Sequence, residues 1–165
     1  MTRPSPLKRR LRLGLMLALR YAPAPWPVKH WAIRQAMPKV TPVSVAVIPD
    51  QQGRVLVLRA RYSGHWLLPG GAVEVGEDPL HGLLRECREE LHASVTVERL
   101  TGIYALAAVR EMYFAFRCAP LTDAPALSEE HEDWRYVYPQ EIKLPLRLAV
   151  RDALTDAPSV QFGRL

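Results

Sequence analysis

The chain is poor in cysteine, with two in 165 residues. These two, Cys87 and Cys118, cannot build a disulfide framework, and neither belongs to a CxxC pair or lies near a ligand-spaced histidine cluster. The sequence also lacks an uninterrupted apolar run of about 18 residues, which a membrane-spanning helix needs, because Arg12 and Arg20 bracket residues 13–19. We therefore expect a reducing, cytoplasmic compartment, no structural zinc and no spanning helix.

Acidic residues are missing from residues 1–49, which contain nine basic residues. All 17 acidic residues lie beyond that point, so the remainder of the chain carries a net charge of −4, although the whole chain carries +5. The positive charge thus belongs to an N-terminal extension. The high isoelectric point is no sign of nucleic-acid binding, and we expect no specific nucleic-acid partner.

Apolar residues make up 48% of the chain and charged residues 24%, values typical of a globular protein. We predict a basic, leucine-rich helical extension over residues 1–41 and one domain over residues 42–165. The extension has three open roles: packing or a homodimer contact, peripheral docking on an anionic membrane through residues 8–20, and a cleaved signal peptide.

The pattern of apolar and turn residues predicts a mixture of strands and helices. Alternating residues in 43–48 and 54–59 indicate a hairpin, and a helix should begin at Pro79 with Asp78 as its cap and run through Leu91. Further strands are expected at 95–100, 112–118 and 134–138, a closing helix at 144–154 and a short helix around 30–37. Without a regular βαβ alternation, the fold class is α+β, an αβα sandwich.

Three carboxylates stand together on the predicted helix: Glu86, Glu89 and Glu90 are at i, i+3 and i+4. Their mutual repulsion and all-oxygen character suit a magnesium or manganese ion. The core should receive a separate stripe of the helix, consisting of Leu80, Leu84, Cys87 and Leu91.

A solvated surface is the ordinary explanation of an acidic helix face. Here the context favours a metal and a polyphosphate. Pro69-Gly70-Gly71 supplies a bare backbone bend just upstream, and Arg85 and Arg88 lie beside the carboxylates, where they could orient them or contact phosphate.

The same stretch carries a spaced motif: Gly71, five residues, Glu77, seven residues, then Arg85-Glu86-Cys87-Arg88-Glu89-Glu90-Leu91-His92-Ala93. It resembles the signature of the Nudix hydrolases. The motif covers about 23 residues, and the preceding strands extend the likeness over most of residues 43–140. One position departs from the pattern, since His92 stands where a glycine normally supplies a left-handed helix cap, and we expect a somewhat different helix exit there without loss of activity.

The resemblance implies a Nudix fold, with a mixed sheet and a catalytic loop-helix, and the hydrolysis of a nucleoside diphosphate linked to another group. It assigns Mg²⁺, or Mn²⁺, to Glu86, Glu89, Glu90 and the Gly71 carbonyl, and it makes Glu77 and Arg85 the pair that holds loop and helix in register. A late glutamate acts as metal ligand or base in some members. Glu130 is the best match, with Glu129 and Glu132 as rivals, and the general base stays open among Glu89, Glu90 and Glu130.

The substrate is less defined. The elements typical of members acting on ADP-ribose or coenzyme A are missing, which disfavours both. The candidate substrate-binding residues, each with a structural role as the alternative, are Arg59, Arg61, Trp66 and Tyr113. His65, His81 and His131 are expected on the surface. Two other functions remain open: a membrane-associated hydrolase of a lipid-linked or nucleotide-sugar diphosphate, and a non-catalytic nucleotide-binding module.

Overall fold

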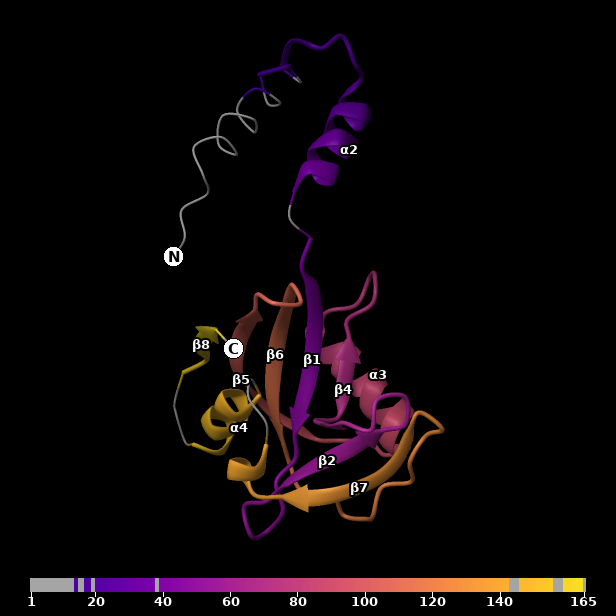
Figure 1. The fold of residues 1–165 in the computed structure, drawn as a ribbon, viewed down its shortest axis with the longest axis vertical. Coiled ribbons are helices and arrows are strands. Elements are labelled where there is room, and N and C mark those ends of the chain that lie inside the picture. Colours follow the sequence, from indigo (N-terminus) through magenta and orange to yellow (C-terminus); the bar gives the residue numbers. More distant parts are fainter. Residues whose placement is uncertain are drawn as a thin grey trace. The chain divides into compact units, whose positions relative to one another are not determined.

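The computed structural model describes residues 14, 17–18, 20–37, 39–142, 146–155 and 159–164. The chain divides into two compact units, Met1–Lys39 and Val40–Leu165 (Figure 1). In the first unit, helix α2 (Trp26–Ala36) starts earlier than the predicted short helix, because Pro27 fits the first turn of a helix. Most of residues 8–20, the predicted membrane contact, lie outside the described residues. In the part of the chain that is described, every helix falls short of what crossing a bilayer requires.

The second unit contains two sheets (Figure 1). The larger is mixed, with strand order β4-β1-β6-β5-β8, and the smaller is antiparallel, with order β3-β2-β7. Their strands are β1 (Thr41–Val47), β2 (Val55–Ala60), β3 (Trp66–Leu67), β4 (Gly70–Ala72), β5 (Val97–Leu106), β6 (Glu111–Cys118), β7 (His131–Val137) and β8 (Gln161–Arg164). The helical segments are α3 (Pro79–Leu91), the short 3₁₀ helix η1 (Pro139–Glu141) and α4 (Arg147–Leu154). The prediction of an α+β fold with a mixed sheet is confirmed.

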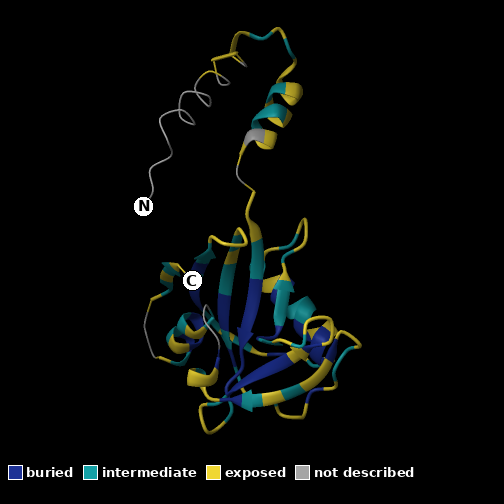
Figure 2. Ribbon diagram, in the orientation of Figure 1, coloured by how far each residue is buried: buried dark blue, intermediate teal, exposed yellow. Residues whose placement is uncertain are grey.

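Successive residues of β1 and β2 enter opposite cores. Val45 and Val57 pack in the cluster that includes residues of α4, whereas Ala46 and Leu58 pack in the cluster that includes Leu83 and other residues of α3. Side chains alternate across a strand, so a strand buried on both faces must have apolar residues at every position. Figure 2 shows β1 and β2 dark blue over most of their length. Helices therefore cover both sheet faces, as in the predicted αβα sandwich.

The predicted hairpin of residues 43–48 and 54–59 is wrong. β1 pairs with β4 and β6, whereas β2 pairs with β3 and β7 in the other sheet. The two segments meet directly near the turn alone, where Pro49 and Val55 form an isolated bridge and the Leu56 N–H donates to the carbonyl oxygen of Ile48. Both strands are buried on two faces, so their alternation does not identify the partner, and the polar turn between them serves as a crossover between sheets.

Helix α3 begins and ends at the predicted residues, although the expectation of a somewhat different exit at His92 is wrong. The carboxylate of Asp78 accepts hydrogen bonds from the backbone N–H groups of Leu80 and His81, and Pro79 occupies the first helical position. At the other end His92 adopts the left-handed conformation, with φ of 48°, that a glycine normally takes. Its ring Nδ1 lies 2.8 Å from the carbonyl oxygen of Ala126, a contact that holds the histidine in place.

The predicted core stripe of α3 is displaced by a fraction of a turn. Leu80 is exposed and Leu83 is buried in its place, together with Cys87 and Leu91. The buried arc also includes Glu90, so packing and chemistry do not occupy separate faces of the helix as predicted. Because the arc is centred nearer Leu83 than Leu84, one of the three helix carboxylates must enter the protein interior.

Candidate active site

A glycine bend lies against the carboxylates of α3. Gly70 has φ of 129°, and a β-carbon there would lie 2.1 Å from the carbonyl oxygen of Ser44 on β1, so only glycine fits. A β-carbon on Gly71 would lie 2.6 Å from the carboxyl carbon of Glu86. The Gly70 N–H donates a hydrogen bond of 2.7 Å to Oε2 of Glu90. The close pairing of β4 with β1 thus brings bare backbone to two carboxylates.

Arg85 ties the loop to the helix. Its Nε and Nη2 donate to the two carboxylate oxygens of Glu77, at 3.0 and 3.2 Å, and Nη2 also donates to the carbonyl oxygen of Ala72. Its Nη1 donates to one oxygen each of Glu86 and Glu89, at 2.9 and 3.0 Å. The hydrogen bonds from Arg85 hold the pKa of Glu77 below its usual range, and those carboxylates raise the pKa of the guanidinium. One planar guanidinium therefore sets the positions of three glutamates.

Glu90 is the most buried of the acidic side chains in this cluster, with 8% of its surface exposed. Burial raises its pKa to about 8, and the nearby negative charges of Glu86, Glu130 and Glu89 add to that rise, while the Gly70 hydrogen bond opposes it. Burial likewise raises the pKa of Glu86 despite its ion pair with Arg85. Such a crowded, partly dehydrated set of carboxylates would be stabilised by a cation.

Of the three late glutamates, Glu130 affects the electrostatics of this cluster. Its negative charge contributes to the raised pKa values of both Glu86 and Glu90. Glu132 instead forms an ion pair with Arg59, at 3.0 Å. Glu129 is exposed, and its backbone carbonyl accepts a hydrogen bond from Arg61. A role of Glu130, rather than of its rivals, as metal ligand or base therefore stays a prediction, supported by this effect of its charge.

The surface prediction is wrong for His131, although it holds for His65 and His81, which are exposed. His131 is 6% exposed, and its Nε2 lies 3.5 Å from Oε1 of Glu90. The cause is a register shift between β2 and β7: Arg59 pairs with Asp133, but Ala60 pairs with His131, so Glu132 is skipped. This extra residue turns His131 to the α3 side of the sheet, where regular alternation would have placed it on the opposite side.

The predicted substrate-binding residues have different surroundings. Arg59 pairs with Glu132, and Arg61 donates to the backbone carbonyls of Glu129, in the loop before β7, and of His131, the first residue of β7. The Tyr113 hydroxyl donates to Oε2 of Glu111, at 2.6 Å, while its ring packs against the α4-side core. Trp66 lines a pocket.

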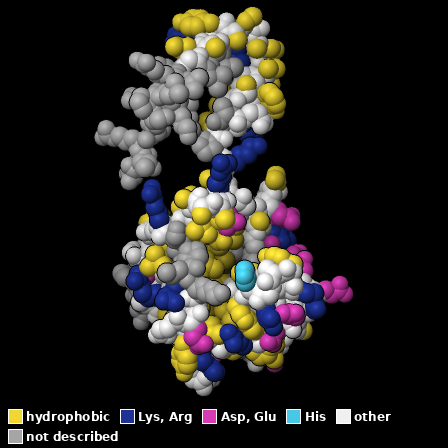
Figure 3. All heavy atoms as spheres, in the orientation of Figure 1, with side chains coloured by type: hydrophobic (Ala, Val, Ile, Leu, Met, Phe, Trp, Pro, Cys, Tyr) yellow, Lys and Arg dark blue, Asp and Glu magenta, His cyan; other side chains and the backbone are white. Residues whose placement is uncertain are grey.

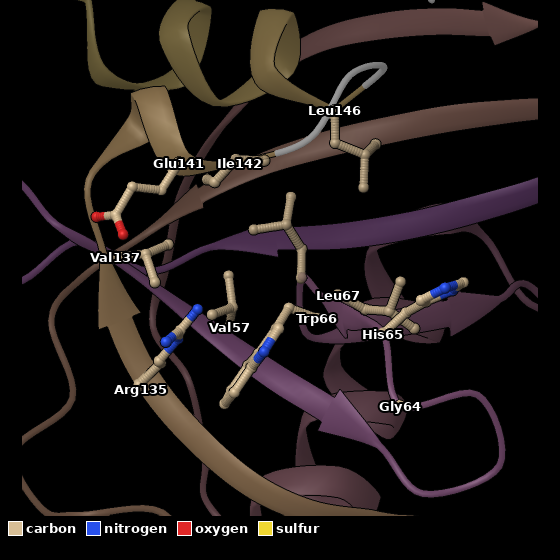
Figure 4. A pocket seen from close by; sticks show the side chains of 11 residues that line it. Val57, Gly64, His65, Trp66, Leu67, Arg135, Val137, Glu141, Ile142 and Leu146 are labelled. Atoms are coloured by element: carbon tan, nitrogen blue, oxygen red, sulfur yellow. The ribbon is translucent and has the colours of Figure 1, made fainter.

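That pocket, of about 380 Å³, lies on the α4 side of the smaller sheet (Figure 4). The guanidinium carbon of Arg135 lies 4.2 Å from the centre of the Trp66 ring, a cation–π contact. Val57 forms the floor between them, and Glu141 and Ile142 line the side nearest η1. The pocket therefore presents an aromatic face, a cation and a carboxylate to one ligand-sized volume.

Sequence analysis missed Arg135 because its strand carries no recognisable motif. The register explains its position: Arg135 lies opposite Val57, and Trp66 lies opposite Arg59, two residues further along β2. Positions two apart share a face, so both side chains reach the same side of the sheet. Alternation within β7 is readable in the sequence, but the pairing of β7 with β2 is not.

The carboxylate oxygens beside the glycine bend are ligands that a hard divalent cation prefers. The backbone approaches Glu86 so closely that a β-carbon on Gly71 would not fit. Among the residues that the structure describes, however, no three acidic, histidine or cysteine side chains already form a coordination shell. Glu89 is directed to Arg85, and its side chain is 59% exposed. Metal ligation by Glu86, Glu89, Glu90 and Gly71 therefore stays a prediction.

The raised pKa of Glu90 predicts a pH-dependent stability. Between about pH 4.5 and 8 the folded, metal-free protein keeps the Glu90 proton that the unfolded chain has lost, so the free energy of unfolding should fall as pH rises. We expect a loss on the order of a few kcal/mol across this range, relative to Glu90→Gln. The comparison is needed because the lowered pKa of His131 acts with the opposite sign near pH 6.5. Denaturant unfolding of the wild type and of Glu90→Gln at pH 5 and 8 measures this loss. An equal change in unfolding free energy for the two proteins would contradict the prediction.

Comparison with known proteins gives a consistent result. The NUDIX domain family model matches residues 39–157. A MutT-like protein of Streptomyces ambofaciens is 36% identical over 106 residues, which are 64% of this chain and 69% of that protein. The nucleoside triphosphatase NudI of Escherichia fergusonii is 31% identical over 111 residues, 59% of this chain and 79% of its own. The fold is similar to that of an ADP-ribose pyrophosphatase from Streptococcus suis, with a TM-score of 0.65, 16% identity and coverage of 75% of this chain and 99% of that one.

Proposed function

Because the chain belongs to the Nudix hydrolases, enzymes that act on nucleoside diphosphate derivatives, we propose that it hydrolyses the pyrophosphate bond of a nucleoside di- or triphosphate derivative with the help of a divalent cation. The alternative of a non-catalytic binding module is set aside, because the family is enzymatic and all three helix glutamates are retained.

The observation that carries this proposal is the crowding of Glu86, Glu90 and Glu130 beside the Gly70-Gly71 bend. Burial and mutual repulsion make the ionised forms of Glu86 and Glu90 costly in the metal-free protein. Each carboxylate would be stabilised by Mg²⁺ or Mn²⁺. If the cluster had a purely structural role, we would expect basic side chains to neutralise its acids. Here a single nitrogen of Arg85, Nη1, is shared between one oxygen of Glu86 and one of Glu89, so much of the negative charge is left for a cation.

In the proposed mechanism Glu86, Glu89 and Glu90, with the Gly71 carbonyl, would hold the cation. When bound, the cation would neutralise charge on the phosphates and lower the pKa of the attacking water. Arg85 keeps Glu86 and Glu89 oriented. Among Glu89, Glu90 and Glu130, we assign the general base to Glu130, because Glu89 is tied to Arg85 and Glu90 is buried, whereas Glu130 is exposed to incoming water.

The nucleoside would occupy the pocket of Trp66 and Arg135 (Figure 4). Leu68 lines this pocket, and Gly70, two residues further along the chain, donates to Glu90, so this edge of the pocket lies close to the glycine bend. A base could stack on the indole if the guanidinium of Arg135, which now lies over the ring, moved aside or covered the base.

As the substrate we propose a nucleoside triphosphate, because a relative 31% identical to this chain is a nucleoside triphosphatase. The test is hydrolysis of a panel of nucleoside triphosphates, dinucleoside polyphosphates, nucleotide sugars and CDP-alcohols, with and without Mg²⁺ and with Glu89→Gln as a control. Cleavage that depends on both Mg²⁺ and Glu89 supports the proposal. If members of the panel bind but none is cleaved, the proposal is contradicted.

Replacing Trp66 with alanine should weaken substrate binding while the chemical step is largely retained. Loss of one stacking surface is worth about 1 to 3 kcal/mol, so KM should rise roughly five- to one-hundred-fold, with kcat changed less. Steady-state kinetics on the best substrate of the panel measures this. Tyr62→Ala is a matched control, since Tyr62 is 85% exposed and lies outside the pocket. An unchanged KM would exclude Trp66 from the substrate site.

A second candidate, a membrane-associated hydrolase of a lipid-linked or nucleotide-sugar diphosphate, rests on the first unit. Trp26 and Trp31 are 70% and 63% exposed, and the same helix contains Lys29 and Arg34 but no acidic residue. Figure 3 shows hydrophobic and basic side chains, and no acidic one, on the visible face of the described part of this unit. Aromatic and basic side chains together favour an anionic membrane surface. Vesicle binding of the full chain, compared with a chain starting at Thr41, tests this candidate. Equal vesicle binding by the two chains would reject the membrane-associated candidate. The remaining proposal would then be a cytoplasmic enzyme whose extension has another role, such as a homodimer contact.

A further inference from the structure

The loop before β7 is held from two sides. On the α3 side, the backbone N–H of Ser128 donates to the carbonyl of Glu90, and that of Ala126 donates to the carbonyl of Leu91, both at 3.1 Å. These bonds attach the loop to the last turn of the helix that carries the carboxylates. The segment that follows, Glu129-Glu130-His131, then crosses to the end of β2.

On the β2 side, a single residue, Arg61, contacts three consecutive residues of the segment. Its Nε donates to the carbonyl oxygen of Glu129 at 2.8 Å, and its Nη2 donates to that of His131 at 3.5 Å. Its backbone N–H donates to the carbonyl oxygen of Glu130 at 2.8 Å. The side-chain contacts join positions 68 and 70 residues apart in the sequence.

The contacts of Arg61 lie next to the register shift between β2 and β7. Where β2 and β7 lose regular pairing, between Arg59 and Ala60, ladder hydrogen bonds cannot fix the extra residue. The guanidinium of Arg61 supplies donors just beyond that point, in a rigid fork that can span two carbonyls. The shifted segment also carries Glu130, whose charge acts on Glu86 and Glu90, and His131, which packs against Glu90.

We propose that Arg61 is a positioning residue: it holds the Glu129–His131 backbone so that the Glu130 carboxylate faces the carboxylates of α3. This inference rests on the role of Glu130 in the proposed function. It replaces the predicted role of Arg61 in binding substrate, since two of its side-chain nitrogens are directed to protein carbonyls.

Arg61→Ala tests the inference by kinetics. The substitution removes the two side-chain hydrogen bonds and keeps the one from the backbone N–H. The loop should therefore stay attached to β2, but the position of its backbone should be less well fixed. A misplacement of about 1 Å can cost about a hundred-fold in rate, and we expect kcat to fall about ten- to one-hundred-fold with KM within about two-fold. Arg61→Lys should not rescue kcat, because an ammonium cannot reproduce the fork. In a Glu130→Gln background, Arg61→Ala should have no further effect on kcat.

A second readout uses the metal-free protein and no substrate. Amide hydrogen exchange at residues 128–131 should become faster in Arg61→Ala and remain unchanged in Arg117→Ala. Arg117 is a matched control, because it also donates to a backbone carbonyl, that of Ala153, and to a carboxylate, that of Glu98.

The outcomes separate two failures. A raised KM with unchanged kcat, unchanged exchange at residues 128–131, or additive losses with Glu130→Gln would each overturn the positioning role of Arg61. Full activity of Glu130→Gln would overturn the proposed role of Glu130, and the inference with it. Faster exchange, a kcat loss and non-additivity together would establish it.

Discussion

Replacement of Glu90 by glutamine is expected to lower kcat by about a thousand-fold or more, while the fold is retained. The substitution preserves the shape of the side chain and an oxygen that can accept the Gly70 N–H, but it removes the charge that a cation would need. The metal-free variant should be at least as stable as the wild type at pH 8, because glutamine has no buried charge to ionise.

Glu98→Gln is the matched control for this experiment. Glu98 is a partly exposed carboxylate on β5 that pairs with Arg117, outside the candidate site. It should change kcat by less than about two-fold, as surface pairs contribute little. Activity of Glu90→Gln near the wild-type level would mean that Glu90 is a structural acid, and the proposed metal site would then be wrong.

Removal of divalent cations should abolish turnover, and Mg²⁺ or Mn²⁺ should restore it. Because a cation that binds only the folded state stabilises it, adding Mg²⁺ at a hundred times its Kd should raise the unfolding free energy by about 2.7 kcal/mol. This stabilisation should be larger at pH 8 than at pH 6, since protons compete for Glu90 at the lower pH. Chelation, followed by kinetics and thermal melting with added Mg²⁺, measures both effects.

Loss of the stabilisation in Glu90→Gln would link the cation to this carboxylate. If chelated protein instead retains full activity, the proposed metal-dependent mechanism is wrong. If Mg²⁺ restores activity but stabilises the wild type and Glu90→Gln equally, the cation is required elsewhere, for example as a complex with the nucleotide, and Glu90 is no ligand.

The local part of the structure could be predicted from the sequence. The spacing of Glu77, Arg85 and the three glutamates lies within one loop and one helix, where distances follow from helical geometry. Asp78 and Pro79 fixed the start of α3 for the same reason, since a cap bonds only to its own first turn. The exit of the helix was predicted less well, since a histidine was expected to change it, yet His92 adopts the left-handed conformation of the usual glycine.

Contacts between strands could not be predicted in the same way. Strands buried on both faces, such as β1 and β2, have apolar residues throughout, so the sequence predicted a hairpin although the two belong to different sheets. The displacement of the α3 core arc had a similar origin. Which of several leucines faces the sheet depends on how the helix is rotated against it, and that rotation buried Glu90.

The sequence by itself determined the family, the fold class and the glutamates of the candidate site, because these depend on residues close together along the chain. Only the tertiary structure decided that the charge of Glu130 affects them, that His131 is buried against Glu90, that Trp66 and Arg135 share a pocket, and that Arg61 bonds to the backbone of Glu129 and His131. Each of these depends on the register of β2 with β7 or β3. A shift of one residue moves a side chain to the opposite face of a sheet, and no local pattern fixes that register.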